Sequence, residues 1–420
     1  MSNKKTFINK SGEATMADDF IRASAKKNSL ISEPVSGKKT KILFVTRPIA
    51  PPWDEASKNM AYQLAINVAK INPNLEIHLM TKGDLKDAIS DLPKNIIQHP
   101  IYTSAENDFT FSQKIRAILF QWKMKNQFDI VHYFFTPSKL NGFIIKNFLY
   151  PKKSKTIQTI ATLRGDLMSD EEIKKSIFGD ILVAYSKHTK KKLKRLGFSH
   201  THHIYPGIDI EDFTPQEKNS ELLKECNLTA NDFILSFTGE YVRLGGIEES
   251  IDSFIEVSKQ IPAAKLFLTL RVKNEKDAEK KKKIIVKFKK LGLLNKIVFG
   301  DKVDFSRYKM SDVYNLHDIN IYPIHNMNGK FDIPLVVPEA MACKKPVILS
   351  DLPLLKEFAN HNNAIIIEKE NTKELTEAIL DLYNNPEKRE EIANNGMRFV
   401  RRKFNIEFIA EEYNNLYESL

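Results

Sequence analysis

The stretch KILFVTRPIAPPWDEASKNMAYQLAINVAKI, residues 41–71, sets a pattern that much of the chain repeats. It begins with consecutive apolar residues at 42–45, which is typical of a strand buried on both faces. After a proline-rich turn, apolar residues return at the spacing of an amphipathic helix: Met60, Leu64, Val68 and Ile71. A strand followed by such a helix predicts the first unit of a parallel sheet.

The alternation of strand and helix patterns runs through the chain twice. It stops at HIYPGIDIEDFTP, residues 203–215, where two prolines indicate a boundary, and it restarts at FILSFTG, residues 233–239. Strands that alternate with helices favour a parallel sheet covered on both faces. We therefore predict an α/β fold of two doubly wound, Rossmann-like domains with a ligand cleft between them.

These boundaries divide the chain into four predicted parts. Residues 1–38 are polar and aperiodic, which predicts a flexible leader. We expect one Rossmann-like domain over residues 39–206 and a second over residues 207–403. The last segment, residues 404–420, is expected to be a helix that packs back on the first domain.

Composition and charge narrow the classes of partner. The 420 residues carry a net charge of +11, which suits nucleic acid, an anionic membrane surface or phosphorylated small molecules. Nucleic acid is disfavoured, because the lysine-rich runs at 187–198 and 273–292 lack interleaved aromatic residues. The two cysteines, Cys226 and Cys343, are expected to be buried free thiols, which fits a reducing compartment and a cytoplasmic location.

No segment predicts a membrane span or a signal peptide. No apolar run reaches the roughly 18–20 residues that cross a bilayer. The first twenty residues have no apolar core of the kind that a signal peptide requires.

One acidic residue stands in an apolar setting. In GKFDIPLVVPEAMACKKPVILSD, residues 329–351, Glu339 follows an apolar run at the start of a predicted short helix. A carboxylate there can accept two hydrogen bonds from a vicinal diol, and it also lies favourably at a helix N-terminus. On the residues alone, ligand binding and simple stabilisation of the helix both stay open.

Three motifs, taken in their order along the chain, carry a family resemblance. The first is residues 203–215, with Pro206, Gly207, Ile208, Asp209, Phe213 and Pro215. The others are FTGEYVRLGGIEESIDSF at 237–254 and PEAMACKKPVILSD at 338–351. Together they resemble the retaining, GT-B-fold glycosyltransferases of family 4.

The resemblance implies an enzyme that moves a hexosyl group from an NDP-sugar to a hydroxyl of a glycan or a lipid-linked acceptor. It implies retention at the anomeric carbon, no metal and no cofactor beyond the donor substrate. The first domain would hold the acceptor and the second the donor. Glu339 would accept hydrogen bonds from the ribose hydroxyls, and backbone N–H groups near Leu335 and Val336 would contact the diphosphate.

The sequence departs from the family at the sugar-binding position. The family's second Glu, eight residues before Glu339, is Phe331 here. Asp332 is expected to replace it from a shifted register, and the neighbouring Lys330 is a further candidate for contact with the donor.

The diphosphate-binding cations are also displaced. The family's Arg and Lys positions are occupied by Glu240 and Gly245. Arg243 in the same loop, and Arg271 after the next strand, are the predicted replacements, because an arginine offers paired donors to phosphate oxygens. Arg243 would then stabilise the charge that develops on the leaving group.

Two positions of the first domain follow the family only in part. DIVHYFFTP, residues 129–137, carries His132 where the family delivers a His into the cleft; the alternative is a structural histidine. ATLRGD, residues 161–166, has Arg164 where a His is common, which makes Arg164 a candidate for substrate binding.

Several alternatives stay open at this point. No cluster of residues has the spacing of a metal site, since the two cysteines are isolated. A sugar-nucleotide epimerase or hydrolase could share the fold. The missing family residues also allow a non-catalytic subunit of a glycan-assembly complex.

One helical segment, FTFSQKIRAILFQWKMKN at 109–126, suggests a membrane contact. Basic residues flank its apolar face, so it could dock on an anionic leaflet as a peripheral membrane protein. The other interpretation, which the sequence slightly favours, is a helix whose apolar face covers the core. That face comprises Phe111, Ile115, Ile118, Leu119 and Trp122.

Overall fold

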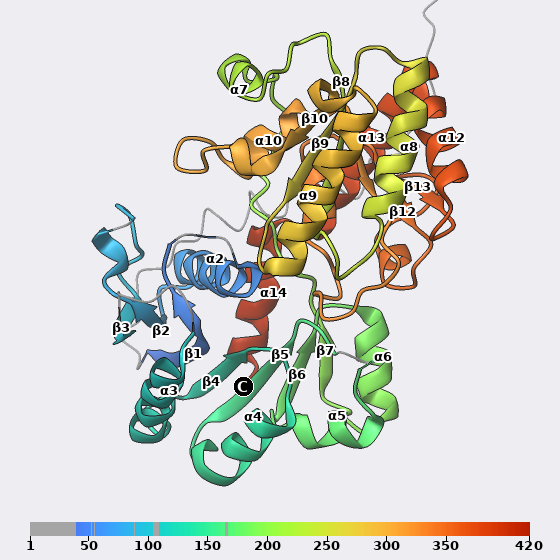
Figure 1. Cartoon of the computed structure of the whole chain (residues 1–420). Coiled ribbons are helices and arrows are strands. Elements are labelled where there is room, and N and C mark those ends of the chain that lie inside the picture. Colours follow the sequence, from blue (N-terminus) through green and yellow to red (C-terminus); the bar gives the residue numbers. More distant parts are fainter. Residues whose placement is uncertain (1–38, 52, 54, 88, 104–108, 164–166) are drawn as a thin grey trace, which may run out of the picture. The chain divides into compact units, whose positions relative to one another are not determined.

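Each half of the chain folds into one parallel sheet flanked by helices (Figure 1). The computed structural model describes residues 39–420 apart from 52, 54, 88, 104–108 and 164–166. Residues 40–420 form one compact unit. The predicted fold of two doubly wound α/β sheets is confirmed, whereas the predicted leader lies outside the described residues.

The first sheet has seven strands in the order β3-β2-β1-β4-β5-β6-β7. Its strands are β1 (Thr40–Ile49), β2 (Leu75–Lys82), β3 (Ile96–Tyr102), β4 (Ile130–Phe134), β5 (Lys155–Ile160), β6 (Ile181–Ala184) and β7 (Thr201–His203). The accompanying helices are α2 (Ala56–Ile71), α3 (Phe111–Met124), α4 (Lys139–Ile144), α5 (Asp170–Ser176) and α6 (Lys187–Arg195). Two short pieces complete it: the 3₁₀ turn η1 (Leu85–Asp87) and the π-helical turn η2 (Ile145–Leu149).

The second sheet has six strands in the order β10-β9-β8-β11-β12-β13. Its strands are β8 (Phe233–Gly239), β9 (Ala264–Leu270), β10 (Ile297–Phe299), β11 (Ile319–Tyr322), β12 (Val347–Ser350) and β13 (Ile365–Ile367). The helices are α7 (Ser220–Glu225), α8 (Ile247–Gln260), α9 (Glu275–Lys290), α10 (Met310–Leu316), α11 (Val336–Ala342), α12 (Thr372–Asn384) and α13 (Pro386–Lys403). Three 3₁₀ turns lie between them, η3 (Leu294–Lys296), η4 (Gly300–Lys302) and η5 (Leu355–Glu357).

Both sheets reverse their strand order next to their first strand. β1 lies between β2 and β4, and β8 lies between β9 and β11, with all four pairs parallel. Where the order reverses, the connections leave the carboxyl ends of the strands in opposite directions and open a crevice. We therefore expect a ligand site among the residues that follow these central strands.

The central strands are buried on both faces, as their continuous apolar sequences predict. Ile42, Leu43 and Phe44 of β1 are completely buried. The helix α2 covers this sheet with three of the four predicted apolar positions; the fourth, Ile71, is 43% exposed.

The strand β3 was not expected from the sequence. It pairs with β2 at the edge of the first sheet, and only its first and last residues are buried. Pro100 interrupts its pattern, and a proline is tolerated in a strand whose other side forms no ladder.

The chain crosses between the two halves twice. The first crossing contains Ile208, whose backbone N–H donates to Phe404 O at 2.7 Å, and the N–H of Ile406 donates back to Ile208 O at 2.9 Å. A Cβ on Gly207 would lie 2.4 Å from Ile406 Cδ1, so only glycine allows this close approach.

After the second crossing, the chain ends in the helix α14 (Ile406–Glu418), which lies beside the first sheet (Figure 1). Tyr417 on α14 is hydrogen-bonded to His132 on β4, with 2.8 Å between Oη and Nδ1. Asn72, the residue after α2, donates to Glu418 Oε1 at 2.9 Å. The last helix is therefore part of the core of the first half.

Candidate functional site

A cavity of about 1980 Å³ lies at the carboxyl ends of the central strands and is lined by residues of both halves. From the first half come residues near the carboxyl end of β1, such as Arg47, and residues that follow β4, such as Phe135. From the second half come residues that follow β8 and β9, and the start of α11. This is the position where an α/β sheet of this topology binds its ligands.

Glu339 lies on the wall of this cavity, in the first turn of α11. Its Oε2 accepts a hydrogen bond of 3.0 Å from the hydroxyl of Tyr314. Burial raises the pKa of Glu339 to about 7, although the Tyr314 bond acts in the opposite direction. Leu335 and Val336, immediately before it, line the same cavity.

Four charged residues form a second feature of the wall, which we call the Glu240 cluster. The carboxylate of Glu240, directly after β8, accepts hydrogen bonds from Arg243 Nε at 2.6 Å and Arg243 Nη2 at 2.5 Å. It also accepts a hydrogen bond from Lys273 Nζ at 2.9 Å and forms an ion pair of 3.1 Å with Lys330 Nζ. All four residues line the cavity.

The Glu240 cluster is rich in positive charge. Burial acts to raise the pKa of Glu240, but the three neighbouring cations outweigh it and hold that pKa well below its usual value. Three cations around one carboxylate leave a formal excess of two positive charges beside the cavity. Such an excess suits an anionic ligand with several oxygens, such as a diphosphate.

The structure thus brings together six of the nine predicted site residues on one cavity: Glu339, Leu335, Val336, Arg243, Lys330 and Arg271. Lys273 was missed by the sequence analysis. It lies two residues beyond Arg271 after β9, so the rule that ligands lie beyond strand ends could have indicated it.

Two predicted residues lie elsewhere. His132 is completely buried, and its two ring nitrogens are paired with Tyr417 Oη at 2.8 Å and with Thr159 Oγ1 at 2.7 Å. Burial holds the pKa of His132 well below its usual value. The structure therefore places His132 in the core under α14, and it is not on the cavity wall.

Asp332 is also turned away from the cavity. It is 4% exposed, and its Oδ2 accepts a hydrogen bond of 2.6 Å from Ser186, the N-cap of α6. Burial raises the pKa of Asp332 to about 6. The prediction that Asp332 replaces the family's sugar-binding Glu thus finds no support in its position, and Arg164 lies outside the described residues.

A second carboxylate joins Asp332 at the start of α6. Glu357 accepts hydrogen bonds from the backbone N–H groups of Lys187 at 2.5 Å and of His188 at 3.2 Å. Acidic groups stabilise a helix N-terminus, so these two residues of the second half stabilise a helix of the first.

The helix α3 has an inverted distribution of polarity. It buries Gln113, Ala117 and Gln121, whereas Leu119 is 59% exposed and Trp122 is 63% exposed. The interpretation that the sequence slightly favoured, an apolar face on the core, is therefore wrong. The exposed residues, which we call the outer apolar face, are Phe111, Ile115, Leu119 and Trp122.

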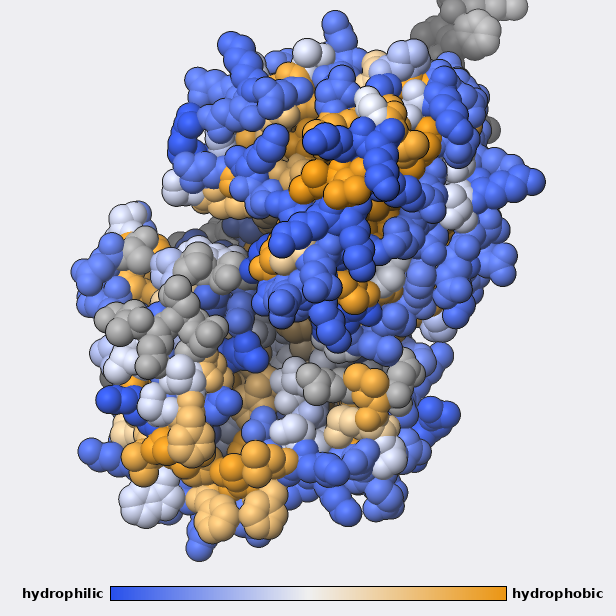
Figure 2. Space-filling model, in the orientation of Figure 1, coloured by the Kyte–Doolittle hydropathy of each residue, from blue (hydrophilic) through white to orange (hydrophobic). Residues whose placement is uncertain are grey.

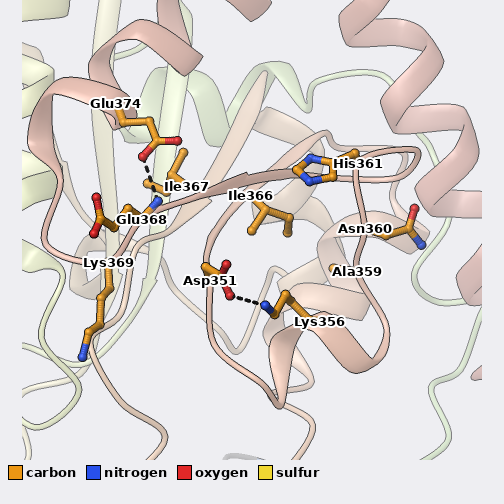
Figure 3. Close-up of a pocket in the computed structure, with 10 residues that line it drawn as sticks. All are labelled: Asp351, Lys356, Ala359, Asn360, His361, Ile366, Ile367, Glu368, Lys369 and Glu374. Carbon is orange, nitrogen blue, oxygen red and sulfur yellow. Dashed lines mark hydrogen bonds and ion pairs between the residues drawn. The ribbon is translucent and has the colours of Figure 1, made fainter.

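A smaller cavity of about 730 Å³ lies beyond β12 and β13 and contains none of the predicted site residues (Figure 3). Asp351 and Lys356 on its wall form an ion pair of 2.6 Å. Glu374 accepts a hydrogen bond of 2.8 Å from the backbone of Glu368. The larger cavity, which gathers six of the predicted site residues, is therefore the candidate site.

Neither a metal cluster nor a membrane-spanning helix is found in the described part of the chain. Among residues 39–420 with the gaps given above, no three His, Cys, Asp or Glu side chains are placed to hold a metal ion. No helix among those residues is both long and apolar enough to cross a membrane.

The fold and the cavity define a GT-B architecture, and known proteins share it. Among solved structures, that of HepE from Anabaena, in complex with UDP and glucose, matches with a TM-score of 0.68 at 16% identity. The match covers 91% of this chain and all of HepE, and at this identity it shows the fold.

The second half of the chain carries the family signal. Residues 218–399, which include Glu339 and the Glu240 cluster, match the family described as "Glycosyl transferases group 1". The resemblance to these glycosyltransferases that the sequence motifs predicted is confirmed.

Two curated glycosyltransferases are similar in sequence to this chain over part of their length. The capsular polysaccharide biosynthesis glycosyltransferase CapM of Staphylococcus aureus is 27% identical over 232 residues, covering 55% of this chain and 56% of CapM. A GDP-mannose-dependent monoacylated α-(1-6)-phosphatidylinositol monomannoside mannosyltransferase of Corynebacterium glutamicum is 23% identical over 250 residues, covering 57% of this chain and 62% of the relative. The chain thus spans under two thirds of each of these relatives.

Proposed function

We propose that the protein is a glycosyltransferase that moves a hexosyl group from an NDP-sugar to a hydroxyl of a glycan or lipid-linked acceptor. The observation that carries this proposal is that Glu339 and the cations of the Glu240 cluster line one cavity. A single carboxylate next to a concentrated positive charge is complementary to a nucleoside diphosphate, in which a diol lies near two phosphates.

Each group has a role in this proposal. Glu339 accepts hydrogen bonds from the two ribose hydroxyls when it is ionised. Arg243, Lys273 and Lys330 bind the diphosphate and stabilise the charge that builds on it as the glycosidic bond to the donor breaks. Because these protein cations supply the electrostatics, the proposed reaction requires no metal.

The comparisons support the donor and leave the acceptor open. HepE was solved with UDP and glucose, and the corynebacterial relative is named for GDP-mannose, so both bases are candidates. The two curated relatives are named for a capsular polysaccharide and for an acylated inositol lipid, which favours an acceptor in glycan assembly. Retention at the anomeric carbon is proposed from the family resemblance.

Titration with UDP and GDP tests this function directly. We expect one of the two to bind with a dissociation constant in the micromolar range, and an excess of EDTA to leave that constant unchanged. Calorimetry measures binding, and a panel of NDP-sugars screened by thermal stabilisation identifies the sugar, since a bound ligand stabilises the folded state.

The products separate the rival functions. NMR of the product with the identified donor is expected to show a new glycosidic bond with the anomeric configuration of the donor. Binding without any turnover would favour a non-catalytic subunit, and turnover without an acceptor would favour an epimerase or hydrolase. No binding of either nucleotide would contradict the whole proposal.

We also propose that the outer apolar face of α3 contacts an anionic membrane surface. Solvent-exposed apolar residues at helical spacing, flanked by basic residues, suit the interface of a bilayer. Lys114, Arg116, Lys123 and Lys125 lie on the same helix or directly after it, and such cations are attracted to anionic lipids.

Removal of the outer apolar face should weaken membrane binding. The double variant Leu119→Asp/Trp122→Asp is expected to bind phosphatidylglycerol vesicles at least tenfold more weakly, because burial of each large side chain contributes roughly 1.5–3 kcal/mol. Cosedimentation measures the bound fraction. The matched control is Val286→Asp, an exposed apolar position on α9. Equal binding of both variants would rule out this contact.

A further inference from the structure

The large cavity has a second arm that the donor does not need. It extends from the donor-binding wall to the space between α3 and the α4–η2 segment. Six of the residues that line this arm are apolar: Phe111, Ile118, Leu140, Ile144, Ile145 and Leu149. A nucleoside diphosphate has no apolar chain to place there.

The two walls of the arm meet at one end. Lys125, just after α3, donates a hydrogen bond of 2.6 Å from Nζ to the carbonyl of Phe148 in η2. Ala117, 6% exposed on the inner face of α3, lines the arm near Ile118. The inner faces of α3 and η2 belong to one apolar cluster, so the arm is part of the packed structure of this half.

The arm opens onto exposed apolar surface. Leu140 is 67% exposed, and Phe143 and Phe148 are each 58% exposed, next to the outer apolar face of α3. Figure 2 shows apolar surface gathered over α3 and α4 (Figure 1). Because the exposed Leu140 also lines the arm, this apolar surface adjoins the cavity that holds Glu339.

We infer that this arm binds the hydrocarbon chain of a lipid-linked acceptor. The inference rests on the proposed function and specifies its acceptor class. A chain that enters from the outer surface would keep its head group in the cavity, beside the bound donor. Lys114 lines this arm, and Lys146 lies on η2; such cations complement the anionic surface from which such a lipid would come.

The polar residues of the arm fit the same occupant. Lys114, Gln121 and Asn141 also line it. The side-chain Nε2 of Gln121 donates to Ala117 O at 3.1 Å, while its buried Oε1 has no hydrogen-bond partner among the described residues. That oxygen is available to a hydrogen-bond donor of the lipid where its chain joins the head group, so the arm can orient the lipid as well as bury its chain.

Chain length is the variable that tests this inference. Hexyl, octyl and decyl glucosides, each below its micellar concentration, are titrated into the full chain with and without saturating UDP or GDP. We expect affinity to rise about threefold to fourfold for each added methylene group until the arm is filled, because each buried methylene contributes a constant transfer energy. Saturating nucleotide should not displace the glucosides.

Two variants place the binding in the arm. Ala117→Phe fills the arm and Ile118→Asp puts a charge into it; each should abolish the dependence on chain length while nucleotide binding stays within twofold. Val286→Asp on α9 is the control that should retain both. If Ala117→Phe fails to bind nucleotide, Ile118→Asp alone tests whether the glucosides bind in the arm. If neither variant folds, the chain-length series on the unaltered protein tests the inference.

The outcomes separate this inference from the proposed function. Nucleotide binding with no dependence on chain length would overturn the inference alone. Chain-dependent binding without nucleotide binding would overturn the donor site and leave a lipid site. Binding that still depends on chain length in both arm variants would place the lipid elsewhere. If light scattering shows that the protein forms dimers that cover the arm, this surface would belong to a contact with a second copy of the protein.

Discussion

Replacement of Glu339 by Gln is expected to stabilise the protein and to disable it at the same time. The substitution removes the ionised acceptor from the donor site, and hydrogen bonds to charged groups contribute roughly 1.5–3 kcal/mol each. Binding of UDP or GDP should therefore weaken by about tenfold to a hundredfold. Calorimetry at pH 8, where the carboxylate is ionised, measures this loss.

The gain in stability follows from the raised pKa of Glu339. Its pKa is about 7 in the folded protein against 4.5 as the ordinary value. A carboxyl group whose pKa is raised by folding contributes fully to the free energy of unfolding below pH 4.5. It loses that contribution as the pH rises through 7. At pH 8, Glu339→Gln should therefore be more stable than the parent by up to about 3 kcal/mol.

The difference in stability between Glu339→Gln and the parent should depend on pH. At pH 4.5 the two proteins should unfold at nearly the same temperature, because the carboxyl is then protonated in the folded state. Glu411→Gln, an exposed position on α14, is the matched control and should show neither effect. Unchanged nucleotide binding in Glu339→Gln would remove Glu339 from the donor site.

Replacement of Arg243 by Met is expected to have the largest effect on turnover. Loss of one preorganised donor to a developing anionic charge typically lowers kcat by about 10²–10³-fold. Binding of the donor should weaken less, since Lys273 and Lys330 remain beside Glu240. Initial rates with the donor found in the panel separate kcat from KM.

The environment of Arg243 also predicts which replacement restores function. Its guanidinium forms two hydrogen bonds to Glu240 and donates from Nη1 to Gly329 O at 3.1 Å. Lysine keeps the charge but loses this paired geometry, so Arg243→Lys should recover only part of the rate. Arg398→Met, on the exposed face of α13, is the control. Equal kcat values for Arg243→Met and the parent would exclude Arg243 from the reaction.

The features that the sequence predicted well are those that depend on local pattern. Buried parallel strands read as continuous apolar runs, which is why β1 and β8 were recognised, and residues beyond strand ends were then expected at the cavity. The edge strand β3 was missed because it is only half buried and contains Pro100.

The features that the sequence could not supply are set by distant contacts. His132 meets Tyr417, which lies 285 positions along the chain, and Asp332 meets Ser186 at a separation of 146. Nothing near either residue in the sequence indicates these partners. The exposure of the apolar face of α3 was misjudged for a related reason, since periodicity shows that a helix has two faces but does not show which one the tertiary structure covers.

The backbone crosses between the two halves near Ile208 and again near Ile406, and this limits how the halves can be exchanged between proteins. Grafting a relative's donor-binding region with one junction near residue 207 would also replace α14, whose Tyr417 belongs with His132 in the other half. In such a chimera, the relative's α14 would pack against the native first sheet, and its side chains would not fit the core of that half. Exchange of donor specificity therefore calls for two breakpoints, the second of them close to residue 404.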